Sequence, residues 1–562
     1  MFNNLVRRAR ILLSNHARFI ILVSLVLSAF FIYWPTMDTL PYLVQGDTGR
    51  DLYAYQKAAN GALVYRDFWW NYGPLMPYYY ALFFKVFGDS IHSIILGRIV
   101  LNVLSGCVIY FSLSLFTARI VAILGALWFW VFNQDFTYTF SHTGGVLLIL
   151  LIIFFVLRSF IHENKKDYLF ISACLFLLFL VKINMGFAAT FAVALSVLLV
   201  NYMRSCGNSA SLKASDLLYL IVPTFLMIVI YGFFLWGLPG YYIKQCFPFF
   251  PGYDPAKMSI FKSMVVFFKK IVLDLMTDES SINTLSFFSK KELVLIKWFL
   301  FISSSCWLLV MSIYRSGFIA VYRKHFLGVL IIVIFIIMSA HEFLLSGTLY
   351  RLWWVTPASI LFIFFLVGTM LQTLGFRTKL FLCGLITALI FQGLMYRFEY
   401  KRLVIEPSKN FLPIKKACVY VGNSSEWLGT VLKTVDFIDR NLAQGEPFLM
   451  LPYEPLFFYL TGRSSPVPEI IFFDHLYIPR EQEERIISDM NIKKVRFILI
   501  STRSESFEKG LGFLGITYCP VLGEYIKRNF VLVRKFGNCE KQGSWIEPIG
   551  INIYQRVKSQ SE

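Results

Sequence analysis

Long apolar runs limit what this chain can fold into. A membrane-spanning helix needs roughly 20 consecutive apolar residues, and about eleven such runs follow one another before the chain becomes polar. In hydrocarbon every backbone polar group must be bonded within the protein, so only helices and closed barrels span a membrane. Runs of this length predict a polytopic α-helical membrane protein. The predicted spans are 19–36, 92–115, 118–134, 141–160, 167–182, 184–203, 216–237, 294–313, 325–345, 353–374 and 379–396.

Composition and charge agree with a membrane protein. The 562 residues are 57% hydrophobic and 15% charged, whereas a soluble domain averages about 25% charged residues. The net charge of +19 does not indicate a nucleic-acid partner, because most basic residues lie in short loops between apolar runs. The partner that these loops indicate is the lipid bilayer.

Basic residues gather in every second loop, and this pattern orients the chain. The positive-inside rule makes those loops cytoplasmic, so the N-terminus is expected in the cytoplasm and the C-terminus outside. The first run has a basic start, yet it ends at 33–36 without a small-x-small cleavage pattern, which indicates an uncleaved signal anchor. The basic loop residues are Arg119; Arg158, Lys165 and Lys166; Arg204 and Lys213; Arg315, Arg323 and Lys324; and Arg377 and Lys379.

The polar part of the chain predicts a second domain. Residues 1–396 form the transmembrane domain, with external loops at 37–91 and 238–293, and residues 397–562 form an extracytoplasmic soluble α/β domain long enough to hold its own core. Cys519 and Cys539 could pair if this compartment is oxidising, and the sequence leaves that open. Strands are predicted at 448–451, 495–501 and 530–536, and helices at 430–443 and 480–490.

The first external loop (37–91) carries a compact charged motif. Asp47, Arg50 and Asp51 lie within GDTGRD (46–51), a few residues past the first apolar run. A helix-like stretch follows at 52–60, so Asp51 is expected to cap that helix. Asp47 is then available for a functional role, and the alternative is that it is an ordinary solvated loop charge.

The order of residues from 46 to 88 matches a known pattern. Asp47 is followed by an arginine three residues later and by Tyr53, then by Tyr-Arg-Asp-Phe (65–68), Gly-Pro (73–74) and a tyrosine-rich stretch. This order resembles the first external loop of the GT-C membrane glycosyltransferases, and most of all the glycosyltransferase family 39-like branch of protein mannosyltransferases and aminoarabinose transferases. The tail segment LPYEPLFFYLTGR (451–463) resembles bacterial members of the group.

One stretch departs from that pattern. The aminoarabinose branch has Lys-Pro-Pro where this chain reads Tyr72-Gly73-Pro74. A phosphate-contacting lysine is therefore absent at this position, which leaves the identity of the donor sugar unassigned.

The resemblance implies a hexosyl- or pentosyltransferase of the cell envelope with a GT-C-like fold. Such enzymes transfer a sugar, with inversion, from a polyprenyl-phosphate donor to a glycan, lipid or protein acceptor on the extracytoplasmic face. Asp47 takes the role of the general base, and Asp135 and Asp51 are candidates for a second acid on the acceptor or a metal. No cofactor is certain, and a divalent metal ion stays open. The expected location is a bacterial inner membrane, although an ER membrane has the same geometry.

Cations near the outer face are candidates for binding the donor phosphate. Charges at the ends of apolar runs are costly and often functional, although long side chains can also extend to lipid headgroups. A lone histidine is more often a hydrogen-bonded structural residue than a ligand or base. The phosphate candidates are Arg50, Lys182 and Arg351, and the further site candidates are His142, Arg66 and Tyr53.

Two other functions fit a chain of this architecture. One is a transporter or flippase of lipid-linked sugars, and the other is a GT-C-type glycan ligase that uses a longer lipid-linked donor. Transporters usually contain internal repeats with charges near the bilayer midplane, whereas this sequence has no repeat and its candidate site charges cluster at the outer face. The glycosyltransferase is therefore the preferred prediction.

Overall fold

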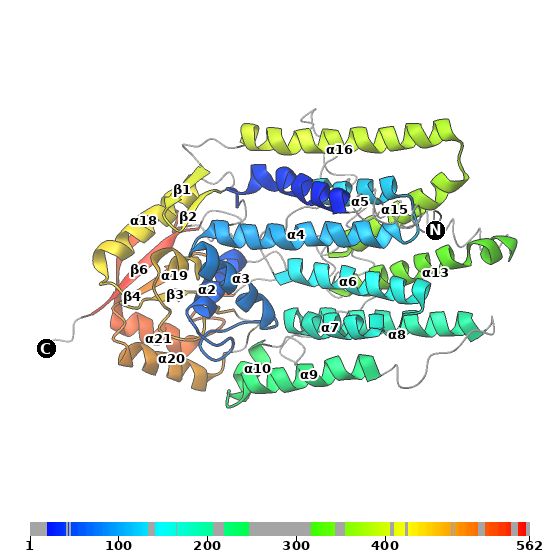
Figure 1. Ribbon diagram of the computed structural model, residues 1–562. Helices are drawn as coiled ribbons and strands as arrows, with labels where there is room; N and C mark the ends of the chain where they lie inside the picture. The colour runs from blue at the N-terminus through cyan, green and yellow to red at the C-terminus, as the bar shows by residue number, and fades with distance from the viewer. Residues whose placement is uncertain are drawn as a thin grey trace.

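Ten apolar helices form a bundle in the part of the chain that the structure describes. The structure is a computed structural model, and it describes residues 19–40, 43, 46–132, 141–164, 166–205, 218–246, 316–342, 354–404, 410–421, 425–473, 476, 478–503, 512–540 and 549–557. The bundle is shown in Figure 1. Its helices are Phe19–Thr36, α4 (Ile91–Ser114), α5 (Arg119–Phe132), α6 (Ser141–His162), α7 (Lys166–Val181), α8 (Ile183–Ser205), α9 (Leu218–Leu235), α13 (Ser316–Ser339), α15 (Thr356–Thr373) and α16 (Phe376–Val404).

These helices coincide with the predicted apolar runs, except for 294–313, which lies outside the described residues. Five of them are long and apolar enough to cross a membrane, and several others are shorter apolar helices. The chain is therefore an integral membrane protein, while the number of its spans stays a prediction.

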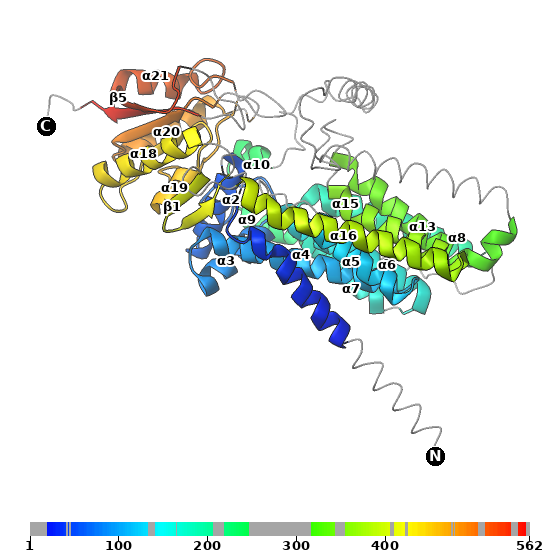
Figure 2. The same ribbon diagram turned by 90° about the horizontal axis from the view of Figure 1, so that it is seen from above.

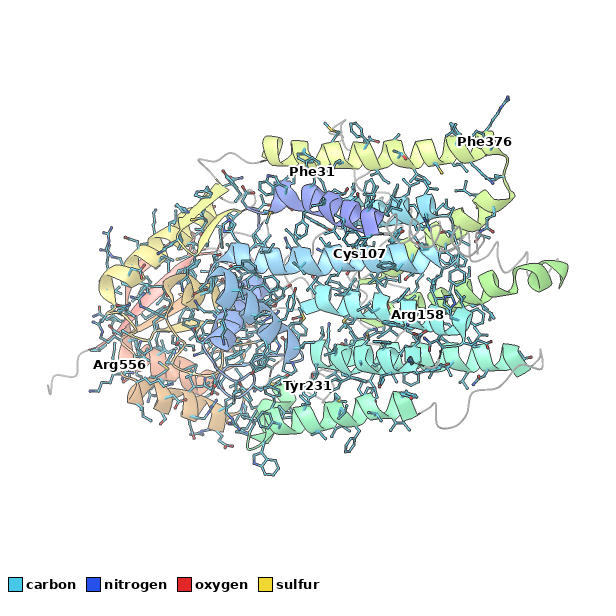
Figure 3. All side chains as sticks on the ribbon, in the orientation of Figure 1. Phe31, Cys107, Arg158, Tyr231, Phe376 and Arg556 are labelled. Carbon is cyan, nitrogen blue, oxygen red and sulfur yellow. The ribbon has the colours of Figure 1, made fainter. Side chains whose placement is uncertain are left out.

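The two ends of the bundle differ in character. The C-terminal part of the chain covers one end, and α5 and α16 begin, and α6 ends, at the other (Figure 1). Figure 3 shows Arg158 and Phe376 toward the end remote from Arg556. At that remote end the Arg158 Nε donates to Asp167 Oδ1 at 2.9 Å, which joins α6 to α7. Both charges are thereby paired where the loop between these helices begins.

The first loop (residues 37–91) contains two helices, α2 (Gly46–Ala59) and α3 (Leu75–Phe87). They pack through aromatic rings, with the Tyr55 and Tyr80 rings stacked at 4.6 Å between centroids. The sequence predicted that Asp51 caps a helix that starts after it, and this is wrong. Helix α2 begins at Gly46, so Asp51 lies inside it and Asp47 lies in its first turn.

The C-terminal region (residues 397–562) is built from helices and two small sheets (Figure 2). A β-hairpin precedes a four-stranded sheet of order β3-β4-β6-β5, in which β3 runs parallel to β4 and β6 is antiparallel to both neighbours. The strands are β1 (Phe411–Ile414), β2 (Ala417–Tyr420), β3 (Leu449–Leu451), β4 (Phe497–Ser501), β5 (Phe530–Phe536) and β6 (Ile551–Arg556). The helices are α18 (Ser425–Asn441), α19 (Leu456–Thr461), α20 (Arg480–Ile492) and α21 (Pro520–Asn529).

The predicted strands and helices of this region are present as β3, β4, β5, α18 and α20. Strand β6 and the β1–β2 hairpin were not predicted. Helix α16 continues past residue 396 to Val404, so a domain boundary at 396/397 stays a prediction. Cys519 and Cys539 are both free thiols in the structure.

Backbone hydrogen bonds fasten the first loop to the C-terminal region. The Leu40 N–H donates to the Tyr420 carbonyl at 2.8 Å, and the Ile91 N–H donates to the Lys416 carbonyl at 2.8 Å. Helix α10 (Gly240–Cys246) adds a side-chain contact, because Gln245 Nε2 donates to Gln482 Oε1 at 2.7 Å. The first loop is therefore held between the bundle and the C-terminal region.

Candidate active site

Two carboxylates share one arginine at the start of α2. Residues three apart on a helix lie on the same side, so Arg50 Nη1 reaches back to Asp47 Oδ1 at 2.8 Å. Arg50 Nε and Nη2 both donate to Asp51 Oδ1, at 2.9 and 2.7 Å. The three side chains differ in burial: Asp51 is 0% exposed, Arg50 2% and Asp47 19%. The buried acid neutralises the guanidinium, and the other acid remains accessible.

A tyrosine from the C-terminal region completes this group. The Tyr453 hydroxyl donates to Asp47 Oδ1 and lies 3.4 Å from Arg50 Nη1. Burial raises the pKa of Tyr453 well above its usual value, although the nearby Arg50 charge lowers it, so the hydroxyl keeps its proton. Both donors reach Oδ1, and no residue that the structure describes donates to Asp47 Oδ2.

Two glycines allow the C-terminal region to come this close. A Cβ atom on Gly46 would lie 2.6 Å from the Tyr453 ring, and a Cβ on Gly49 would lie 2.7 Å from the backbone nitrogen of Leu456. These glycines therefore serve close packing, a use that glycine permits because it has no side chain.

A second charged group lies at the hinge between α7 and α8. Lys182 is the residue between the two helices, and its Nζ donates to Glu342 Oε1 at 2.6 Å and lies 2.8 Å from His142 Nε2. Asn184 Nδ2 also donates to Glu342 Oε1, at 3.2 Å. The His142 ring stacks on Trp354 with 3.8 Å between centroids. Lys182 keeps 15% of its side chain exposed.

Tyr72 lies between the two charged groups. Its ring centre is 5.1 Å from the Arg50 Cζ and 5.2 Å from the Lys182 Nζ. The next residue fixes it in place, because the Gly73 N–H donates to the Val181 carbonyl at 2.9 Å. Burial raises the pKa of Tyr72 far above the usual range, with Arg50 opposing that shift, so the ring carries no charge of its own.

The structure thus brings several predicted site residues to one end of the bundle: Asp47, Arg50, Asp51, Lys182 and His142. Arg66 is exposed in the turn between Val64 and Phe68 and forms no ion pair with a described residue. Tyr53 faces the C-terminal region instead, where its hydroxyl accepts a bond from the Ser465 N–H at 2.9 Å. Asp135 and Arg351 lie outside the described residues.

The sequence analysis did not predict three residues of this site: Glu342, Tyr453 and Tyr72. Glu342 stands beside His341 at the end of an apolar run, and an ionisable pair in such a place was a usable signal. Tyr453 lies in the tail segment that resembles bacterial GT-C proteins, but nothing in the segment singles out that residue. Tyr72 was noted only because it replaces a lysine. Among the described residues, no three His, Cys, Asp or Glu side chains gather as metal ligands.

Comparison with known proteins adds independent evidence. Residues 71–238 match the family model of dolichyl-phosphate-mannose-protein mannosyltransferase. This segment includes Tyr72, His142 and Lys182, so part of the second charged group lies within the matched stretch. No protein with curated annotation matches the sequence.

Solved structures share the fold. A crystal structure of the Archaeoglobus fulgidus oligosaccharyltransferase with Zn and sulfate is 12% identical at a TM-score of 0.50, over 86% of this chain and 68% of that chain. The oligosaccharyltransferase AglB from the same organism, in complex with an inhibitory peptide and dolichol-phosphate, is 12% identical at a TM-score of 0.50, over 87% and 70%. The resemblance to the GT-C membrane glycosyltransferases is confirmed.

ArnT from Cupriavidus metallidurans bound to undecaprenyl phosphate is 11% identical at a TM-score of 0.41, over 97% and 98% of the two chains. At these identities the structural matches concern the fold alone. The roles of individual residues depend on the geometry described above.

Proposed function

We propose that this chain transfers a sugar, with inversion, from a polyprenyl-phosphate donor to an acceptor hydroxyl, with Asp47 as the general base. The observation that carries the proposal is the bonding of that carboxylate. Arg50 and Tyr453 hold Oδ1, while Oδ2 receives no bond from the described residues and the side chain is partly exposed. A fixed, accessible carboxylate oxygen is what a general base requires.

The reaction that fits this geometry is a single displacement. The acceptor oxygen forms a bond to the anomeric carbon as the bond from that carbon to the phosphate oxygen breaks. The acceptor proton passes to Asp47 Oδ2, and the polyprenyl phosphate leaves with the bonding electrons. Phosphate is a good leaving group, so one base is sufficient and a strong general acid is not needed.

Lys182 is the proposed ligand of the donor phosphate. It is a compact point charge that can follow a phosphate oxygen, and it lies on the same Tyr72 ring as Arg50. Arg50 itself is almost fully buried and shared by two carboxylates. We therefore assign it to holding Asp47, although the sequence pattern also made it a phosphate candidate. Arg351 remains a phosphate candidate on the resemblance alone.

The fold supports a polyprenyl-phosphate donor. AglB, which shares the fold, has been solved with dolichol-phosphate. We propose that the Asp47 end faces the extracytoplasmic side, because Arg158 lies toward the opposite end of the bundle (Figure 3) and basic loops are typically cytoplasmic. We propose a bacterial inner membrane as the location.

A glycan ligase is the second candidate. The fold matches name an oligosaccharyltransferase, and a donor that carries an oligosaccharide would be attacked by the same base. Donors with one sugar and with several sugars distinguish the two activities directly.

The test uses purified wild type, Asp47→Asn and Asp89→Asn with polyprenyl-phosphate sugars extracted from membranes. Asp89 is a matched control because it is an acid of the same loop, paired with Lys416 at 2.7 Å. Mass spectrometry follows the released polyprenyl phosphate. We expect release by wild type and Asp89→Asn but not by Asp47→Asn. Full release by Asp47→Asn would refute the base assignment, and sugar flipping without release in liposomes would favour the transporter.

A further inference from the structure

We propose that Tyr453 is a positioning residue for Asp47, so that the C-terminal region completes the catalytic site of the membrane bundle. The inference rests on the proposed function, because it assigns the second donor that holds the base. It gives the C-terminal region a part in catalysis that its sequence did not indicate.

The contacts of Tyr453 join two parts of the chain that are far apart in sequence. Its hydroxyl donates to Asp47 Oδ1 and lies 3.4 Å from Arg50 Nη1. The side chain is 1% exposed, and its ring packs against Gly46 and edge-on against Phe473 at 4.8 Å between centroids. The ring therefore fits between α2 and the C-terminal region, and the hydroxyl points to the carboxylate.

The C-terminal sheet determines where this tyrosine lies. Tyr453 lies two residues after the end of strand β3, and the next residue, Glu454, pairs with Arg503 in a buried contact. Arg503 comes just after β4, the neighbour of β3 in the sheet. Leu456 then packs on Gly49. The segment is thus anchored on both sides of Tyr453, by the sheet and by α2.

Two donors on one oxygen orient a carboxylate better than one. With Arg50 alone, the carboxylate can turn about the line from Nη1 to Oδ1; a second donor from another direction removes that freedom and fixes where Oδ2 points. Small errors in the position of a catalytic group reduce rate strongly. The described charged groups around Asp47 are Arg50 and Asp51 on α2, and Lys182 and Glu342 beyond the Tyr72 ring.

Loss of the hydroxyl should lower turnover and leave donor affinity unchanged, a combination that a general packing defect would not produce. The turnover number falls because Oδ2 is less well placed. The affinity for the donor should not change, because the Tyr453 hydroxyl bonds to Asp47 and Arg50, whereas the proposed ligand of the donor phosphate is Lys182.

The experiment compares full-length Tyr453→Phe with Tyr459→Phe. Tyr459 is a buried tyrosine of the same segment, but its hydroxyl donates to the Lys416 carbonyl rather than to an acid. We expect Tyr453→Phe to lower kcat about 10- to 100-fold and to leave the donor KM within about twofold. Tyr459→Phe should keep the wild-type kcat.

Two further variants keep the outcomes distinct. Asp47→Asn tests the base itself: if it is fully active, the proposed function fails, whatever Tyr453→Phe does. If Asp47→Asn is inactive while Tyr453→Phe keeps the wild-type kcat, the present inference is overturned. Should Tyr453→Phe fail to fold, Gly46→Ala displaces the ring while keeping the hydroxyl. It should reproduce the fall in kcat, and unchanged kinetics would overturn the inference.

Discussion

Asp47 and Asp51 both pair with Arg50, and replacing them one at a time separates the effect on catalysis from the effect on stability. Asp47→Asn keeps an oxygen that can accept the bonds from Arg50 and Tyr453, but the amide cannot take a proton from the acceptor. Asp51→Asn leaves the proposed base untouched and removes half of a buried ion pair. The two variants have the same shape change and differ only in which acid is lost.

The burial of each acid sets the expected magnitudes. Asp51 is 0% exposed and pairs with a guanidinium that is 2% exposed, and removing one partner of a buried pair costs about 3–5 kcal/mol. Arg50 keeps Asp47 as a partner, so we expect Asp51→Asn to lower the free energy of unfolding by about 3 kcal/mol, at the low end of that range. Asp47 is 19% exposed, and its loss should cost about 1 kcal/mol or less. Its loss as a general base should lower turnover about 10²- to 10⁴-fold.

Both quantities can be measured on the same purified samples. Thermal unfolding in detergent can be followed with a thiol-reactive dye, since Cys107, Cys174 and Cys246 are buried free thiols in the folded protein. Release of polyprenyl phosphate gives the turnover. Asp47→Asn should unfold near the wild-type temperature and be inactive, whereas Asp51→Asn should unfold earlier and retain measurable turnover below its midpoint. The reverse pattern, an unstable Asp47→Asn with an inactive but stable Asp51→Asn, would refute the division of roles.

Three more outcomes follow from the contacts around Tyr72. Lys182→Met should raise the donor KM about 10-fold or more with a smaller effect on kcat, measured by donor titration, and an unchanged KM would exclude Lys182 as the phosphate ligand. Glu342→Gln removes the carboxylate that holds Lys182 at 2.6 Å, so free polyprenyl phosphate should inhibit it more strongly than wild type; weaker inhibition would contradict this. Gly73→Ala should lower both the melting temperature and turnover, because its Cβ would lie 2.0 Å from the Leu180 carbonyl oxygen. Gly429→Ala, in a helix with open space around it, should unfold at or above the wild-type temperature, and equal losses in both variants would count against the packing argument.

The sequence predicted correctly those elements that depend on interactions within one segment of the chain. Apolar runs became helices because length and hydrophobicity act within one segment. The acid and arginine at 47 and 50 were recognised as a unit from the compact polar stretch GDTGRD (46–51) and its resemblance to the GT-C pattern, although the helix was predicted to start only after it. In the C-terminal region, strongly apolar strands were found, but β6 (Ile551–Arg556) was missed since only half of it is apolar and its place in the sheet depends on β4 and β5.

The misplaced start of α2 has a physical reason. Gly46 and Gly49 lower the local helix propensity, because glycine disfavours helices by roughly 1 kcal/mol relative to alanine. In the folded protein both glycines lie against Tyr453 and Leu456, where a side chain would not fit. Tertiary packing therefore outweighs local propensity, and the contact involved joins residues about 400 positions apart, which one sequence cannot reveal.

The site is assembled from three parts of the chain, and this explains why its pairs were hard to foresee. The bundle contributes Lys182 and Glu342, the first loop contributes Arg50 and Tyr72, and the C-terminal region contributes Tyr453. Tyr72 touches both cations and is fixed to the α7–α8 hinge through the adjacent Gly73. Arg50 and Lys182 are each already paired with a carboxylate. A donor phosphate that binds Lys182 would therefore add negative charge beside an ion pair that is already neutral. The Tyr72 ring lies between Lys182 and Arg50, the arginine that holds the base.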